Sequence, residues 1–227
     1  MAAILVTGFG RFPGAPINPT IALIAALKRR RRPALATVRI AKHAFATRYA
    51  AVDRDLPALI ARETPDAVVL FGVATKAKCL RIELVARNRA SVLFPDAGGA
   101  KPSVATIAPG APPRQNGRFC VSRLLAAARS TGMRAAVSRN AGAYLCNYAY
   151  WRALEAAARP GGPRLVVLVH IPPLAIKALP RRAGEQQQAR QRMHSLANLT
   201  RTAEAILIAV RAEPLPSPTR GEGKSPC

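Results

Sequence analysis

Residues 66–72, DAVVLFG, form an almost unbroken apolar run that follows Pro65 and ends at Gly72. Two other short runs have the same character, AILV at 3–6 and RLVVLV at 164–169. Strands that are apolar along most of their length are typical of a parallel sheet covered by helices on both faces. The three runs therefore predict buried central strands.

Helix signals separate these runs. Asn18 followed by Pro19 is typical of an N-cap and the first residue of a helix, which would end before Pro33. Further helices are expected at about 47–62, 118–130, from near Cys146 to before Pro160, and 184–212, and further strands at about 37–40, 81–86 and 135–138. This alternation predicts an α/β protein, a three-layer α/β/α sandwich with a mainly parallel central sheet.

The length and the last residues bear on domain organisation. A chain of 227 residues fits one large domain better than two small ones. We expect a single domain over residues 1–212. Residues 213–227, EPLPSPTRGEGKSPC, are rich in Pro, Gly and Ser and predict a disordered tail.

The chain is strongly basic, with 35 Lys and Arg against 11 Asp and Glu and a formal net charge of +24. Such a charge suggests nucleic acid or an acidic membrane as partner. The basic residues are spread along the chain, however, and the densest cluster, KRRRR at 28–32, stands at the end of a predicted helix, where cations complement the helix dipole. No basic run is interleaved with aromatic residues, so nucleic-acid binding is the less favoured alternative.

The four cysteines, Cys79, Cys120, Cys146 and Cys227, lie far apart and form no Cys-x-x-Cys pair. This spacing argues against a structural zinc site and against a disulfide-stapled secreted fold, and we expect no metal and no cofactor. The N-terminus lacks a basic leader, and no apolar run approaches the roughly 20 residues that a membrane span needs. The sequence thus predicts a cytoplasmic protein with no membrane partner.

Two candidate catalytic residues stand at predicted strand ends, where α/β proteins gather functional groups. Cys146 follows the strand at 135–138 and opens a helix, whose free N–H groups stabilise a thiolate and an oxyanion. His170 closes the strand at 164–169 and could accept the thiol proton. A third, acidic group would orient the imidazole.

Position alone does not decide between these residues and their rivals, because most lone cysteines are inert core residues. Cys79 lacks a strand-to-helix context, and Cys120 is expected inside a helix. His43 could close the second strand, whereas His194 stands on a polar helix. Cys146 with His170 is favoured but not established.

Four segments carry a resemblance to a known family: TGFGRFPGAPINPT at 7–20, RIELVARN at 81–88, AGAYLCNYAYWRAL at 141–154 and LVHIPP at 168–173. They resemble the motifs of pyroglutamyl peptidase I, a family of cysteine peptidases. The spacings of 63 residues from Glu83 to Cys146 and 24 from Cys146 to His170 are close to the family pattern. The resemblance covers roughly residues 3–210.

The resemblance implies an α/β/α fold and removal of pyroglutamate from peptides with a blocked N-terminus. It implies Cys146 as nucleophile, His170 as base and Glu83 as the residue that orients the base. Phe9 and Phe12 would form the apolar pocket around the lactam ring, although plain loop packing would also explain them. Members of the family often self-associate, so a homo-oligomer is also implied.

Two segments depart from the family. Val73 stands where the family commonly has a glutamine, and Leu93 where it has an arginine near the active site. Arg87 or Arg89 could compensate for that arginine. Three hypotheses therefore stay open: a pyroglutamyl peptidase, a hydrolase with the same three residues but another acyl substrate, and a non-catalytic or nucleic-acid-binding protein.

Overall fold

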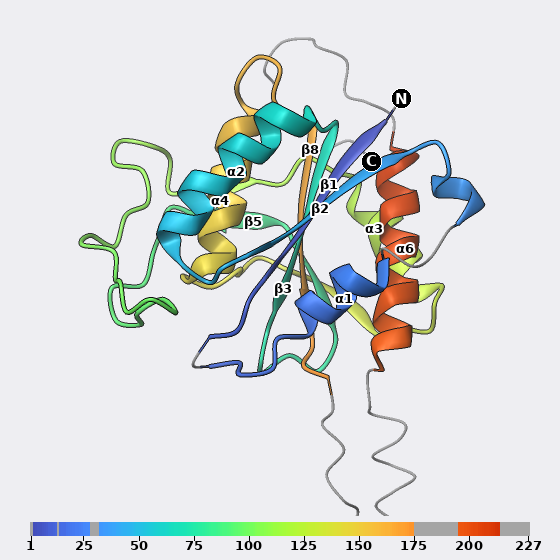
Figure 1. The fold of residues 1–227 in the computed structure, drawn as a ribbon, viewed down its shortest axis with the longest axis horizontal. Coiled ribbons are helices and arrows are strands. Elements are labelled where there is room, and N and C mark those ends of the chain that lie inside the picture. The colour runs from blue at the N-terminus through green and yellow to red at the C-terminus, as the bar shows by residue number, and fades with distance from the viewer. Residues whose placement is uncertain (1, 13, 28–31, 175–194, 214–227) are drawn as a thin grey trace, which may run out of the picture.

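The computed structural model describes residues 2–12, 14–27, 32–174 and 195–213. Its centre is a six-stranded sheet with the strand order β2-β1-β3-β8-β4-β7 (Figure 1). These strands are β1 (Ala3–Phe9), β2 (Arg39–Phe45), β3 (Ala67–Val73), β4 (Leu80–Glu83), β7 (Ala135–Ser138) and β8 (Leu165–Ile171). Two short strands, β5 (Val85–Arg87) and β6 (Arg114–Asn116), form a separate antiparallel pair.

Most of the central sheet is parallel, as the sequence predicts. β2, β1, β3 and β8 run in one direction, whereas β4 pairs antiparallel with β8 and parallel with β7. In the register of the sheet, His170 of β8 lies opposite Gly72 of β3 on one side and Arg81 of β4 on the other. The carboxyl ends of β3 and β8 and the start of β4 therefore lie at the same end of the sheet.

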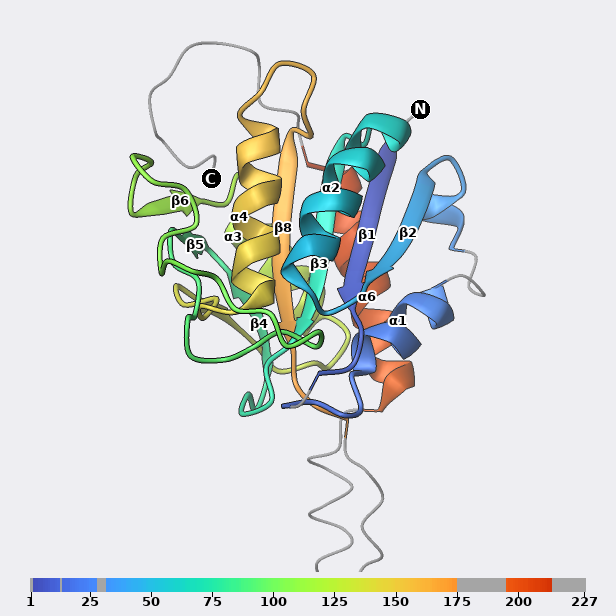
Figure 2. The same cartoon turned by 60° about the vertical axis from the view of Figure 1, so that its left-hand side comes forward.

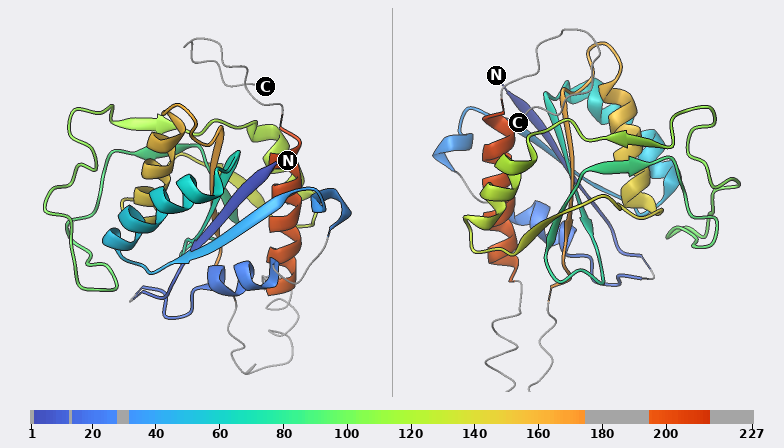
Figure 3. Two further views of the ribbon diagram at one scale, coloured as in Figure 1. Left: turned by 45° about the horizontal axis from the view of Figure 1, so that its top comes forward. Right: turned by 180° about the vertical axis from the view of Figure 1, so that it is seen from behind.

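Helices cover both faces of the sheet, which confirms the three-layer prediction. They are α1 (Pro19–Leu27), α2 (Tyr49–Glu63), α3 (Val121–Arg129), α4 (Leu145–Ala157) and α6 (Leu196–Arg211), with a short 3-10 helix, η1 (Pro33–Leu35). Helices α2 and α4 pack on one face, and α1, α3 and α6 pack on the other (Figures 1 and 3). Figure 2 shows α2 and α4 lying along the strands, with α6 behind the sheet.

The apolar run that predicts the sheet supplies both hydrophobic cores. Val68 and Leu70 point into the core under α2 and α4, whereas Val69 and Phe71 point into the core under α1, α3 and α6. All four are fully buried. Because side chains alternate along a strand, a strand covered on both faces needs apolar residues at every position.

Two predicted helix starts can be compared with the structure. Helix α1 begins at Pro19, and Oδ1 of Asn18 accepts a hydrogen bond from N–H of Thr20 at 3.1 Å, which confirms the predicted cap. The predicted start of the last helix at residue 184 lies outside the described residues. The described helix α6 begins at Leu196 with Ser195 as its N-cap. Residues 214–227 of the predicted tail also lie outside the described part.

Two strand predictions need correction. The strand expected at 81–86 is two strands, β4 and β5, that separate at Leu84 and belong to different sheets. The strand expected at 37–40 is β2, which extends to Phe45. β2 is an edge strand with half-exposed residues, so it lacks the apolar run that marks the buried strands. In the part of the chain described here, no helix is long and apolar enough to cross a membrane.

Candidate active site

Cys146 is the second residue of α4 and is half-buried. Its sulfur lies against the end of β3: a Cβ built on Gly72 would be 2.7 Å from Sγ of Cys146 and 2.9 Å from Cδ2 of His170. Glycine at position 72 therefore leaves the space in which the two side chains meet. Cys146 lies in the first turn of α4, where backbone N–H groups lack acceptors within the helix.

His170 is held between Glu83 and Cys146. Its Nδ1 lies 2.8 Å from Oε1 of Glu83, and its Nε2 faces the space beside Gly72 that Cys146 also borders. His170 is the sixth residue of β8 and lies inside the strand, rather than closing it as the sequence suggests. Strand pairing on both sides therefore holds its backbone in place.

The surroundings of His170 favour its protonated form. Burial of the ring opposes protonation, but the Cys146 side chain and the Glu83 carboxylate outweigh it and raise the pKa of His170 to about 9. An imidazolium beside Sγ stabilises negative charge on the sulfur. The pair is thus suited to attack by sulfur followed by proton donation from the ring.

Glu83 ends β4 and is fully buried. Burial raises the pKa of its carboxyl, whereas the hydrogen bond and the charge of His170 lower it. Together with smaller contributions from Ser138 and Arg81, these effects outweigh burial and hold the pKa of Glu83 below its usual value. An ionised carboxylate can hold the imidazole with a proton on Nδ1.

Helix α4 also carries two polar residues that position Glu83 and the strand after it. Asn147, fully buried, donates from Nδ2 to the carbonyls of Arg87 and Arg89 and accepts from N–H of Arg87. Tyr150, one turn after Cys146, donates to the carbonyl of Glu83 at 3.0 Å. Sequence reasoning assigned neither residue a role, although both lie in the segment around Cys146.

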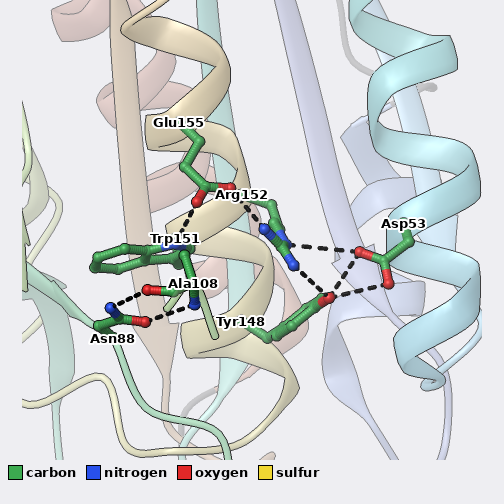
Figure 4. Close-up of polar contacts among 7 residues, drawn as sticks. All are labelled: Asp53, Asn88, Ala108, Tyr148, Trp151, Arg152 and Glu155. Carbon is green, nitrogen blue, oxygen red and sulfur yellow. Dashed lines mark hydrogen bonds and ion pairs between the residues drawn. The ribbon is translucent and has the colours of Figure 1, made fainter. Parts of the chain in front are cut away.

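A polar network fixes the outer side of α4 (Figure 4). The hydroxyl of Tyr148 donates to Asp53 of α2 at 2.8 Å, and Arg152 donates to the same hydroxyl at 3.1 Å. Glu155 accepts from Arg152 and from the indole of Trp151. These bonds tie α4 to α2, so the helix that carries Cys146 is held on its outer side as well.

Asn88 fixes the long loop that precedes β6. Its side chain donates to the carbonyl of Ala108 at 2.7 Å and accepts from the N–H of the same residue at 2.8 Å (Figure 4). The two bonds resemble the pair of hydrogen bonds between neighbouring strands, and they join residues that are 20 positions apart in the chain. Asn88 is one of the residues that the sequence resemblance matched, and in the structure it is a loop anchor.

A pocket of about 280 Å³ opens beside Cys146 and His170. Its lining is formed by Phe9, Phe12, Asn18, Thr47, Val73, Ala74, Thr75, Lys76, Ala77, Arg81, Asn140, Ala141, Gly142, Tyr144, Leu145, Cys146 and His170. Phe9 is nearly fully buried, and the ring of Phe12 packs against Tyr144 with centroids 5.7 Å apart. The structure thus brings both predicted pocket phenylalanines together with the cysteine and the histidine.

The end of β1, which presents Phe9 to the pocket, and the residue after it are held by three polar side chains. Oγ1 of Thr20 accepts from N–H of Phe9 and donates to its carbonyl. Asn18 and Thr47 both donate to the carbonyl of Gly10 at 2.9 Å. The apolar wall of the pocket is therefore fixed by hydrogen bonds from α1 and from the segment before α2.

The two departures from the family pattern lie in different places. Val73 lines the pocket at the end of β3, whereas Leu93 is 73% exposed and does not line it. Arg87 and Arg89 are also exposed and lie outside the lining, so the structure does not support them as replacements. Arg81 does line the pocket, and sequence reasoning missed it because strand pairing alone brings it beside His170.

The rival residues lie elsewhere. His43 belongs to β2 and faces Asp55 of α2 at 3.3 Å, and Cys79 stands in the loop before β4. Cys120 precedes α3 rather than lying inside it, and His194 falls outside the described residues. Within the described residues, no group of three or more His, Cys, Asp or Glu side chains could hold a metal ion.

Comparison with known proteins gives the family of this chain. The family model described as pyroglutamyl peptidase matches residues 2–211. A pyrrolidone-carboxylate peptidase of Thermococcus kodakarensis is 34% identical over 169 residues, which cover 74% of this chain and 80% of the relative. The crystal structure of pyrrolidone carboxyl peptidase from Thermus thermophilus superposes with a TM-score of 0.73 at 29% identity, covering 91% of this chain and 99% of that one.

A further solved structure shows the fold. Pyrrolidone carboxyl peptidase from Fervidobacterium islandicum superposes with a TM-score of 0.81 at 22% identity, covering 94% of this chain and all of that one. The family match spans every described helix and strand, including those that carry Glu83, Cys146 and His170. The chain therefore belongs to the pyroglutamyl peptidase family of cysteine peptidases.

Proposed function

We propose that this chain removes the pyroglutamyl residue from the N-terminus of peptides. In this proposal Cys146 is the nucleophile, His170 carries the proton and Glu83 orients His170. The observation that carries it is the contact of Cys146 and His170 beside Gly72, with Glu83 bonded to the far side of the ring. Membership in the family and the activity named for the Thermococcus relative support it.

The first half of the reaction follows from the positions of these groups. Sγ of Cys146 attacks the pyroglutamyl carbonyl and forms a bond to its carbon. The negative charge that develops on the carbonyl oxygen faces the N–H groups at the start of α4, which can stabilise it. His170 gives its proton to the departing amine, and the C–N bond breaks to leave a thioester on Cys146.

The second half restores the enzyme. A water molecule attacks the thioester carbonyl and gives its proton to His170, and the sulfur departs as thiolate. Free pyroglutamate is the product, and His170 and Cys146 return to their starting states. Glu83 remains ionised throughout, since its part is to hold the ring and to stabilise its charge.

The pocket suits a small, flat and neutral ring. Phe9, Phe12 and Val73 supply apolar surface, and the size of about 280 Å³ is near the lower end of small-ligand sites. An ordinary aminopeptidase binds a free amine through a charged group, and a pyroglutamyl terminus has none. An apolar wall is therefore the appropriate way to recognise it.

A fluorogenic pyroglutamyl amide of aminomethylcoumarin tests the proposal. We expect release of the fluorophore that is abolished by iodoacetamide and by Cys146→Ser. The matched control is Cys79→Ser, because Cys79 carries the other described free thiol and does not line the pocket. Absence of thiol-dependent release from folded protein would refute the proposed substrate, and loss of release in Cys79→Ser would refute the proposed nucleophile.

One observation favours a second candidate, a hydrolase with the same three residues and another acyl group. Val73 places apolar surface in the pocket where the resemblance predicts an amide. A cyclopentanecarbonyl amide of the same fluorophore has the ring size but lacks the lactam N–H and C=O groups. Faster thiol-dependent release from this amide than from the pyroglutamyl amide would favour the second candidate.

Two further parts of the proposal come from the sequence. We propose a cytoplasmic location, from the spacing of the cysteines, and self-association, from the behaviour of the resembled family. Light scattering of the purified chain tests the second. Salt-sensitive binding to arbitrary duplex DNA without hydrolysis of any amide would instead support the nucleic-acid-binding alternative.

A further inference from the structure

Two cationic side chains line the pocket that contains Cys146. Lys76 belongs to the loop between β3 and β4, and Arg81 is the second residue of β4. No Asp or Glu lines this pocket among the described residues. Of the ion pairs found in the described part of the chain, none includes Lys76 or Arg81. The pocket thus presents positive charge that described acidic side chains do not pair.

Strand geometry places Arg81 beside the reacting groups. Side chains alternate along a strand, so Arg81 and Glu83 project from the same face of β4. The register puts Arg81 directly opposite His170, and the Arg81 side chain is half-buried. Its charge also acts on Glu83, whose pKa it helps to lower. Arg81 therefore stands at the depth of the catalytic histidine and on the same side of the sheet.

Strand order separates Phe9, in the apolar wall, from Arg81. Phe9 ends β1, Gly72 lies on β3, His170 on β8 and Arg81 on β4, and these strands are neighbours in that order. Three strand spacings correspond to about 14 Å from β1 to β4. Cys146 contacts the space at Gly72 and His170, in the middle of this row. An acyl ring on the Phe9 side therefore directs the leaving peptide toward β4.

We infer that Lys76 and Arg81 bind a carboxylate on the leaving peptide, next to the bond that is cleaved. The inference rests on the proposed function and names its substrate class: pyroglutamyl peptides whose next residue carries a negative charge. Such a charge can come from an Asp or Glu side chain or from the terminal carboxylate of a dipeptide. A guanidinium matches the geometry of a carboxylate, so Arg81 is the main contact and exposed Lys76 an auxiliary one.

The net charge of +24 does not by itself produce this preference. A diffuse positive potential speeds the approach of every anion and is screened by salt beyond the Debye length. The cations of the pocket act on a carboxylate at contact distance, where they can distinguish two peptides of the same shape. The preference should therefore depend on Arg81 and Lys76 and not on a basic residue outside the pocket.

Three matched peptides test the inference by their kcat/KM values: pyroglutamyl-Glu-amide, pyroglutamyl-Gln-amide and pyroglutamyl-Gln as the free acid. At low salt we expect the Glu amide to exceed the Gln amide by roughly five-fold, the size of a partly exposed ion pair. The ratio should fall at about 1 M salt, where the Debye length is near 3 Å. A higher kcat/KM for the free acid than for the Gln amide would show that the terminal carboxylate can also supply the negative charge.

Variants locate the preference. Because Arg81 neighbours Glu83, the readout is the Glu-to-Gln ratio and not the absolute rate. Arg81→Gln should bring the ratio close to one, Lys76→Gln should lower it less, and Arg81→Lys should retain part of it. The control is Lys78→Gln: Lys78 is exposed on the same loop, does not line the pocket and should keep the wild-type ratio.

The outcomes separate this inference from the proposed function. Equal rates on the Glu and Gln amides in the wild-type enzyme would overturn the inference and leave the pyroglutamyl peptidase intact. Failure to cleave any of the peptides would overturn both. If Arg81→Gln is too slow to measure, the test is the Glu-to-Gln ratio of the wild-type enzyme at low and high salt. A ratio that does not change with salt would overturn the inference.

Discussion

Nδ1 of His170 lies 2.8 Å from Oε1 of Glu83, and less than a tenth of either residue is exposed. This one contact sets the orientation of the ring, since it directs Nε2 toward the space that Cys146 borders. It also keeps a negative charge beside a ring that burial would otherwise keep neutral. The first two predictions follow from it.

Glu83→Gln should preserve the shape of the side chain and remove its charge. We expect kcat on a pyroglutamyl amide to fall by about 100-fold or more, the scale of a misplaced general acid and base. Ser138→Ala, which removes a smaller influence on the same carboxylate, should cost much less. Equal losses in the two variants would show that the charge of Glu83 is not the cause.

Stability should decline as pH rises from about 6.5 to about 9. The pKa of His170 is raised from 6.5 to about 9, so in this window the native state binds a proton that the unfolded chain has released. The stabilisation is complete below the unfolded pKa and lost as pH rises through the folded pKa. Denaturant melts across this range measure it, and His170→Ala should flatten the profile. Wild-type stability that stays constant over the window would contradict the prediction.

Tyr150→Phe should loosen Glu83 without touching the substrate pocket. The variant removes a buried hydrogen bond to the Glu83 carbonyl, and we expect a loss of about 1 kcal/mol in unfolding free energy. A fall in kcat with little change in KM would identify Tyr150 as a positioning residue. Tyr148→Phe is the comparison, since it removes a bond to Asp53 on the far side of α4 and should lower kcat less.

Gly72→Ala should separate the nucleophile from the base. The added methyl group would lie 2.7 Å from Sγ of Cys146 and 2.9 Å from the His170 ring, so one of them must move. Misplacement of reacting groups by about 1 Å can cost roughly 100-fold in rate. Gly10→Ala adds a methyl group at an ordinary 3.4 Å contact and should have the smaller effect. Near-normal kcat in Gly72→Ala would refute this placement of the pair.

Two positions depart from the family pattern, and introducing the family's residue at each of them should have unequal effects. Val73→Gln places an amide in the pocket, where one hydrogen bond to the lactam would lower KM for a pyroglutamyl amide by roughly five-fold. Leu93→Arg should leave kcat/KM unchanged, because Leu93 is 73% exposed and does not line the pocket. A strong gain from Leu93→Arg would show that the loop reaches the site during the reaction.

The positions of the central strands and of the helix at Cys146 were predictable from sequence, because they depend on local patterns. Apolar residues at every position of 66–72 indicate a strand buried on both faces, and Asn18 with Pro19 indicates a helix start. The edge strand β2 was predicted with the wrong end. Its half-exposed residues pack against one neighbouring strand and lack a distinctive pattern.

The amino-acid sequence by itself determined the α/β/α architecture, the family and the identity of Glu83, Cys146 and His170 as candidates. Only the tertiary structure decided that β4 runs antiparallel to β8, which places Arg81 opposite His170 and in the pocket. It also placed Leu93, Arg87 and Arg89 outside that pocket. The physical reason is range: hydrophobic periodicity reports a residue's own strand or helix, whereas strand direction and pocket lining depend on contacts between residues far apart in the chain.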